Sequence, residues 1–250
     1  MKCYGLIGFP LTHSFSQKYF TDKFEREGIL HCSYSNFPIE NIGLLPHLID
    51  SNKNLAGLNV TIPYKEQVIP YLDEVDDNIP LIRAVNTLKI TRQGGKVHLK
   101  GYNTDVYGFS ASLKPFLKEH YQKALILGTG GASKAAAFVL AGLGFEITWV
   151  SRNPGNDKQI SYARLTPAMV AGARVIVNTS PLGMYPDTGS YPDIPYEAIT
   201  ADHVLFDMIY NPPETKFMAL GRQKGANVIN GLQMLHLQAE RSWKIWNSEC

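Results

Sequence analysis

The sequence predicts an α/β protein, and three observations support this prediction. Short apolar stretches typical of strands alternate along the chain with stretches of helical spacing. Two alternating runs flank a glycine pair at residues 94–95, which is typical of a β-hairpin. A glycine-rich turn at residues 128–131 joins a fully apolar stretch to a helix of small residues. Because apolar strands that alternate with helices form parallel sheets, we expect a sheet with helices on both faces.

In the first half, each expected element has its own local signal. Tyr19 and Phe24 follow helical spacing, and that run stops at Gly28. Pro46 falls in the first turn or so of the next helix, where proline is tolerated. The expected elements are a strand at 3–8, a helix at 16–28, a strand at 32–39, a helix at 42–52, a strand at 55–62, a broken helix at 65–75 and a hairpin at 84–103.

The second half is more regular. A strand at 123–128 leads into a helix that ends at Gly144. The last segment reads as a helix, with Leu235 and Trp243 among the residues available for packing. The further expected elements are strands at 145–151, 173–180 and 203–209, a helix at 213–225, a strand at 226–230 and the final helix at 231–247.

Composition excludes several classes of protein. The chain has 250 residues, of which 44% are hydrophobic and 18% charged, and a net charge of +2, so neither nucleic acid nor a membrane is expected as a partner. The number of cysteines, three, is odd, and no two of them form a CxxC motif, so we expect no disulfide framework and no metal site. No apolar run approaches the roughly 20 residues of a membrane span, and no signal peptide is evident. We therefore expect a cytoplasmic protein.

The glycine-rich turn predicts a dinucleotide site. Gly128, Gly130 and Gly131 lie between an apolar strand and a helix, where glycine allows a tight turn and close approach to a pyrophosphate. The helix N-terminus offers free N–H groups to the phosphates. A plain strand-to-helix turn is the alternative.

The next strand indicates which dinucleotide is bound. It ends in Ser151-Arg152-Asn153, where an NAD site would show a carboxylate. A guanidinium suits the 2′-phosphate of NADP, although it can also stack on adenine or simply lie on the surface. We predict NADP as the cofactor.

A lysine follows the strand in LNVTIPYKEQV (58–68). Val60 and Ile62 alternate with polar residues, the strand stops at Pro63, and Lys65 follows. Taken alone, such a lysine is usually a solvated surface charge.

Eight stretches in order resemble motifs of the shikimate/quinate dehydrogenase family, over essentially the whole chain. They are GFPLTHSFS (8–16), NVTIPYK (59–65), AVNTL (84–88), GYNTDVYGF (101–109), GTGGASKAA (128–136), NTSPLGM (178–184), DMIYNPPET (207–215) and GLQMLHLQA (231–239). The resemblance implies a substrate-binding catalytic α/β domain, residues 1–104 plus 231–250, to which the C-terminal helix returns. Residues 105–230 would form a Rossmann-type NADP-binding domain.

The resemblance also implies an activity, the reversible NADPH-dependent reduction of 3-dehydroshikimate to shikimate in chorismate and aromatic amino-acid biosynthesis. Shikimate and 3-dehydroshikimate would be the small-molecule partners of a monomer or homodimer. An NAD-using quinate/shikimate dehydrogenase and a catalytically silent NADP-binding regulatory module are the alternatives. The presence of Lys65 and Asp105 argues against the silent module.

The resemblance assigns roles to individual residues. Lys65 and Asp105 would be catalytic, the lysine stabilising the oxygen that becomes negative as hydride arrives. Either member of this pair could be the formal acid, because strongly coupled groups titrate as a unit. Ser14 and Ser16 would bind the carboxylate, although both also suit a helix N-cap. The other substrate residues would be Asn59, Thr61, Asn86, Tyr210 and Gln238, and the cofactor residues Gly128, Gly130, Gly131, Ala132, Ser151, Arg152, Asn153, Thr179, Met208 and Gly231.

Overall fold

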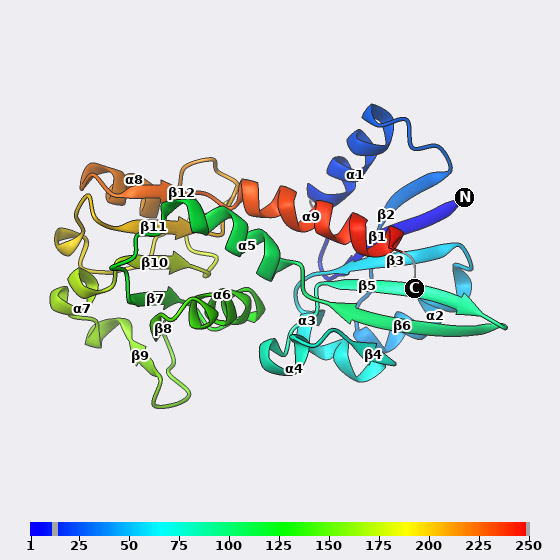
Figure 1. The fold of residues 1–250 in the computed structure, drawn as a ribbon, viewed down its shortest axis with the longest axis horizontal. Coiled ribbons are helices and arrows are strands. Elements are labelled where there is room, and N and C mark those ends of the chain that lie inside the picture. Colours follow the sequence, from blue (N-terminus) through cyan, green and yellow to red (C-terminus); the bar gives the residue numbers. More distant parts are fainter. Residues whose placement is uncertain (12–14, 249–250) are drawn as a thin grey trace. The chain divides into compact units, whose positions relative to one another are not determined.

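The computed structural model describes residues 1–11 and 15–248, which form two compact units. The first unit comprises Met1–Thr104 and Ala239–Cys250, and the second comprises Asp105–Gln238. Helix α9 (Leu232–Asn247) contributes to both units, so the division falls inside this helix, whereas the sequence placed it at Gly231 (Figure 1).

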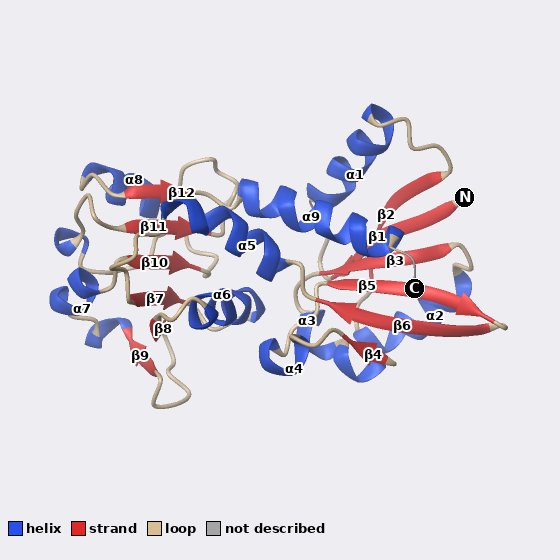
Figure 2. Cartoon of the chain, viewed as in Figure 1, coloured by secondary structure: helices blue, strands red, loops and turns tan. Residues whose placement is uncertain are grey.

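The first unit contains a six-stranded mixed sheet in the order β2-β1-β3-β5-β6-β4 (Figure 2). Its strands are β1 (Lys2–Gly8), β2 (Cys32–Pro38), β3 (Leu55–Val60), β4 (Glu74–Val75), β5 (Thr87–Gln93) and β6 (Lys96–Tyr102). Strands β1, β2 and β3 are parallel, whereas β5 is antiparallel to both β3 and β6. The predicted hairpin is confirmed: Gly94 (φ +57°) and Gly95 (φ +80°) adopt the left-handed backbone that its two-residue turn requires.

Helices cover both faces of this sheet. Helix α1 (Phe15–Arg26) and the end of α9 pack on one face, where Phe20 and Trp246 join Tyr4 in an aromatic cluster. Helices α2 (Leu45–Ser51), α3 (Tyr64–Gln67) and α4 (Ile79–Ile82) cover the other face. A Cβ on Gly57 would lie 2.3 Å from the Trp246 Nε1, so glycine at this position of β3 lets α9 approach the sheet.

The second unit contains six parallel strands in the order β12-β11-β10-β7-β8-β9. They are β7 (Lys123–Leu127), β8 (Glu146–Ser151), β9 (Gln159–Ser161), β10 (Val175–Asn178), β11 (Val204–Asp207) and β12 (Asn227–Ile229). This is the strand order of a dinucleotide-binding Rossmann sheet, and it reverses between β7 and β10. Ligands of such sheets bind at that reversal, beyond the carboxyl ends of the strands.

Both faces of the second sheet are also covered. Helices α5 (Asp105–Leu113) and α6 (Gly131–Gly142) and the first turns of α9 lie on one face, and α7 (Pro167–Gly172) and α8 (Lys216–Gln223) on the other. The α/β class and the Rossmann-type sheet are therefore confirmed. The sequence did not predict α4, α5, α7 or β9. The range of the predicted broken helix, 65–75, contains most of α3, the short 3₁₀ helix η2 (Ile69–Tyr71) and strand β4.

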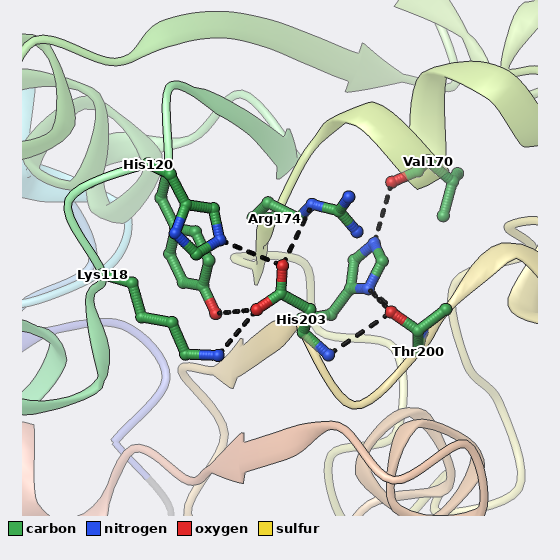
Figure 3. A network of polar contacts seen from close by, with 8 residues as sticks. Lys118, His120, Val170, Arg174, Thr200 and His203 are labelled. Atoms are coloured by element: carbon green, nitrogen blue, oxygen red, sulfur yellow. Dashed lines mark hydrogen bonds and ion pairs between the residues drawn. The ribbon is translucent and has the colours of Figure 1, made fainter.

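A polar network ties together the connections that precede three strands of the second sheet (Figure 3). The Asp202 carboxylate, just before β11, accepts from Lys118 Nζ (2.6 Å), His120 Nε2 (3.1 Å) and the Tyr121 hydroxyl (3.2 Å), all before β7. Arg174 Nε, before β10, lies 3.6 Å from the same carboxylate. This network belongs to the amino-terminal edge of the sheet, opposite the edge at which the glycine-rich turn lies.

Candidate active site

Asn59 is the centre of a buried polar network in the first unit. It lies near the end of β3, and only 6% of it is exposed. The Tyr34 hydroxyl donates to Asn59 Oδ1 (2.8 Å), while Asn59 Nδ2 donates to Thr87 Oγ1 (3.2 Å) and Ser242 Oγ (3.0 Å). Its side-chain amide is therefore bonded to three protein side chains from β2, β5 and α9.

Asn86 extends the same network. Its Oδ1 accepts from the Thr104 backbone N–H (2.7 Å), and the Thr104 hydroxyl lies 3.3 Å from Ser242 Oγ. Asp105 follows Thr104 in the chain and begins α5, where the helix dipole favours a carboxylate. Asn59 and Asn86 thus share one buried layer, which ends at the residue before Asp105.

Ser16 reaches this layer from α1. Its hydroxyl hydrogen-bonds the Tyr34 hydroxyl, which is itself buried. Ser14 lies outside the described residues. Gln238 lies half-buried on α9, one helical turn before Ser242.

The backbone around Lys65 is held from both sides. Thr61 N–H donates to the Ile7 carbonyl (2.9 Å), and Val85 N–H donates to the Lys65 carbonyl (2.7 Å). Tyr64, buried beside Lys65, donates its hydroxyl to the Ile39 carbonyl (2.5 Å). Lys65 is half-buried, and these contacts hold its backbone in place.

In the second unit, the glycine-rich turn lies at the reversal of strand order. Gly128 has φ +118°, and a Cβ on it would lie 2.6 Å from Thr179 Oγ1. Thr179 follows β10, and its hydroxyl donates to the Leu127 carbonyl at the end of β7 (2.8 Å). Gly130 caps α6, and a Cβ there would have nothing within 4 Å, so backbone N–H groups at this helix start are open to approach. Gly131 and Ala132 form the first turn of α6, and the arrangement fits a pyrophosphate.

The end of β8 carries the residues predicted to select the cofactor. Ser151 ends the strand, and its hydroxyl accepts from Asn153 N–H (3.2 Å), which orders the turn. Arg152 lies exposed between them. A cation is therefore presented on an ordered turn at the carboxyl edge of this sheet.

Two more predicted residues meet at this edge. Met208 follows β11, and its N–H donates to the Asn178 carbonyl at the end of β10 (3.0 Å). A Cβ on Gly231 would lie 2.2 Å from the Met208 carbonyl oxygen, so a larger residue would displace this loop. Tyr210, two residues further on, is 37% exposed. The structure thus places Gly128, Thr179 and Met208 at the carboxyl ends of adjacent strands.

Asp207, the last residue of β11, is not among the residues predicted from the sequence. It is completely buried, and burial raises the pKa of its carboxyl to about 6. A signal was available, because an aspartate ends an otherwise apolar strand just before Met208. Within residues 1–11 and 15–248, no group of three or more His, Cys, Asp or Glu could hold a metal, and no helix is both long and apolar enough to span a membrane.

Comparison with known proteins identifies the family. Residues 6–88 match the model of the shikimate dehydrogenase substrate binding domain. A shikimate dehydrogenase (NADP(+)) of Carboxydothermus hydrogenoformans is 37% identical over 262 residues, which cover 98% of this chain and 91% of the relative. The similarity therefore extends through both units.

Solved structures of shikimate dehydrogenases are also similar to this chain. The chorismate mutase/shikimate 5-dehydrogenase fusion protein from Clostridium acetobutylicum is similar with a TM-score of 0.85 and 37% identity, over 99% of this chain and 91% of that chain. Shikimate 5-dehydrogenase from Thermus thermophilus, solved in complex with NADP(H) and shikimate, gives a TM-score of 0.84 and 29% identity, over 99% and 94% of the two chains. The chain belongs to the shikimate dehydrogenase family.

Proposed function

We propose that this chain is an NADP-dependent shikimate dehydrogenase that interconverts 3-dehydroshikimate and shikimate in chorismate and aromatic amino-acid biosynthesis. The observation that carries the proposal is the coexistence of two arrangements in one member of this family. One is a glycine-rich turn at the strand reversal of a Rossmann sheet, with Arg152 after the next strand. The other is Lys65, held beside a sheet whose buried layer includes Asn59 and Asn86.

The second unit is the proposed NADP-binding domain. The turn at 128–131 and Ala132 would hold the pyrophosphate, and Ser151, Arg152 and Asn153 the 2′-phosphate and adenosine. Thr179, Met208 and Gly231 would flank the nicotinamide. NADPH, when bound, supplies the hydride of the reaction.

The first unit, together with α9, is the proposed substrate domain. Ser14 and Ser16 would bind the carboxylate. Thr61, Asn86 and Gln238 would bind the ring hydroxyls. Tyr210, a residue of the second unit, would be a further substrate contact. Asn59, whose amide already bonds side chains from three elements, would serve by holding the layer in place.

Lys65 and Asp105 are the proposed catalytic residues. As the ketone carbon gains a hydride, its oxygen becomes negative, and the Lys65 ammonium stabilises that charge and donates the proton. The ketone thereby becomes a hydroxyl, and Lys65 recovers its proton from solvent. The Asp105 carboxylate would orient the Lys65 ammonium and the substrate hydroxyls.

Initial rates with shikimate and with quinate, each with NADP⁺ and with NAD⁺, test the proposal. We expect the highest kcat/KM with shikimate and NADP⁺. Higher kcat/KM with quinate and NAD⁺ would assign the alternative substrate and cofactor, and no nicotinamide reduction with any pair would reject a dehydrogenase. The cytoplasmic location and a monomeric or dimeric state stay predictions from the sequence.

A further inference from the structure

The buried carboxyl of Asp207 is bonded to three separate points of the chain. Oδ2 accepts from the Thr215 hydroxyl (2.5 Å). Oδ1 accepts from the Ile209 backbone N–H (3.0 Å) and from Asn178 Nδ2 (3.1 Å). These donors belong to the end of β10, the start of the loop after β11 and the end of that loop.

Two of these partners shape the loops that they begin or end. Asn178 Oδ1 accepts from the Ser180 N–H (3.1 Å) and hydroxyl (2.7 Å), which forms the turn after β10. The Thr215 hydroxyl also accepts from Met218 N–H (3.3 Å) and so caps α8. The carboxyl of Asp207 therefore connects the turn after β10 with both ends of the loop between β11 and α8.

Two of the three residues proposed to flank the nicotinamide lie on these same loops. Thr179 follows Asn178 in the chain, and Met208 follows Asp207. Met208 N–H donates to the Asn178 carbonyl, and Gly231 packs against the Met208 carbonyl. Thr179 and Met208 are thus direct neighbours in the chain of Asn178 and Asp207, whose side chains are hydrogen-bonded to each other. A change in the hydrogen bonds of Asp207 should therefore shift both residues.

Stability alone gives a poor account of an acid at this position. Burying a carboxyl is unfavourable, as the raised pKa of Asp207 shows, and an apolar side chain would fill a core position without that cost. A carboxylate, however, can accept several hydrogen bonds in a fixed geometry, which neither an apolar side chain nor a single hydroxyl can do.

We propose that Asp207 is a positioning residue for the cofactor, which fixes the loops after β10 and β11 in the form that binds the nicotinamide half of NADP(H). The inference rests on the proposed function, because it assumes that these loops flank the nicotinamide. It assigns Asp207 no contact with substrate or cofactor.

The test is Asp207→Asn, which keeps the shape of the side chain but replaces one oxygen, a hydrogen-bond acceptor, with an NH₂ group, a donor. Because the loops that flank the nicotinamide would be disturbed, NADPH should bind about tenfold more weakly. Adenosine 2′,5′-bisphosphate lacks the nicotinamide half, and its proposed site is at the end of β8. Its affinity should therefore stay within about twofold of wild type. Both affinities are measured by titration of the purified protein, NADPH by its own fluorescence and the bisphosphate by displacement of NADPH.

Matched variants separate positioning from loss of fold. Asp202→Asn changes an aspartate at the opposite end of β11, so it should lower the melting temperature without changing NADPH affinity. Thr215→Val removes one bond of the Asp207 carboxyl and should weaken NADPH in the same direction. Arg152→Ala should weaken NADPH and the bisphosphate together.

The proposal is overturned if Asp207→Asn binds NADPH like wild type, or if it weakens NADPH and the bisphosphate equally. If Asp207→Asn does not fold, Thr215→Val decides by the same two affinities. These titrations need no turnover. A wild-type protein that binds NADPH but does not oxidise shikimate would therefore reject the proposed function and leave the test of Asp207 intact.

Discussion

Removal of the Ser242 hydroxyl is expected to destabilise the first unit and to weaken shikimate binding. Ser242 is completely buried on α9. Its Oγ lies 3.0 Å from Asn59 Nδ2, 2.8 Å from Thr87 Oγ1 and 3.3 Å from Thr104 Oγ1. Because alanine is smaller and fits without a clash, Ser242→Ala changes chiefly these hydrogen bonds.

The size of the effect follows from how many partners are left unsatisfied. Asn59 Nδ2 keeps acceptors in the Asn86 carbonyl (3.3 Å) and Thr87 Oγ1 (3.2 Å), and the Thr87 and Thr104 hydroxyls remain 3.3 Å apart. Since an unsatisfied buried group costs about 1–3 kcal/mol, partial compensation leaves a loss of about 2 kcal/mol. At about 2–4 °C per kcal/mol for a chain of this size, the melting temperature should fall by about 4–8 °C.

Substrate binding should also change. The Thr104 N–H holds Asn86 Oδ1, so loosening of Thr104 should raise the KM for shikimate by about fivefold, equivalent to about 1 kcal/mol. The kcat should change little, because such contacts bind ground and transition states alike.

Thermal unfolding and initial rates check this expectation against Ser112→Ala. Ser112 is also completely buried, but in the described part of the chain its hydroxyl has no hydrogen-bond partner, so its removal should cost little. If Ser242→Ala proves no more destabilising than Ser112→Ala and leaves the KM unchanged, the assigned role of the network is wrong.

Three further predictions concern chemistry, cofactor choice and pH. Lys65→Ala should lower kcat by about 10²- to 10⁴-fold with little change in shikimate affinity; turnover within a few-fold of wild type would contradict its role. Arg152→Ala should weaken NADP⁺ by about tenfold, less so in high salt, and leave NAD⁺ unchanged; equal losses in the two measured affinities would place phosphate recognition elsewhere. Asp207 has a folded pKa of about 6, above its unfolded value of about 3.9, so its stabilising contribution is full below pH 4 and is lost as pH rises through 6. In urea unfolding from pH 4 to 7, wild type should therefore lose up to about 3 kcal/mol relative to Asp207→Asn, whereas a constant difference would refute the shift.

Features that depend on neighbouring residues were predicted well. The hairpin at Gly94-Gly95 and the strand–turn–helix at Gly128 are local, because backbone sterics let glycine adopt conformations that other residues disfavour. The periodicity of apolar side chains likewise indicated helix α1 and every strand of the second sheet except β9, since burial on one face or both faces imposes the pattern.

Elements stabilised by distant parts of the chain were missed. Helix α5 is an example: a Cβ on Gly108 would lie 2.6 Å from the Met234 carbonyl of α9, so close helix–helix packing helps to hold it. The short strand β9 depends on pairing with β8. Short segments of this kind carry too few periodic residues for a pattern to reveal them.

The sequence by itself determined the α/β class and the glycine turn, because these follow from local spacing. It also singled out Lys65 and Arg152 through motifs, and their roles stay predictions. Only the tertiary structure decided that Asn59 and Ser242, 183 positions apart, share a hydrogen bond, and that Asp207 joins two loops. The physical reason is that such contacts depend on strand order and on the docking of α9. Strand order and the docking of α9 are both set by packing of the core. Because the core residues come from many parts of the chain, no single stretch of sequence specifies them.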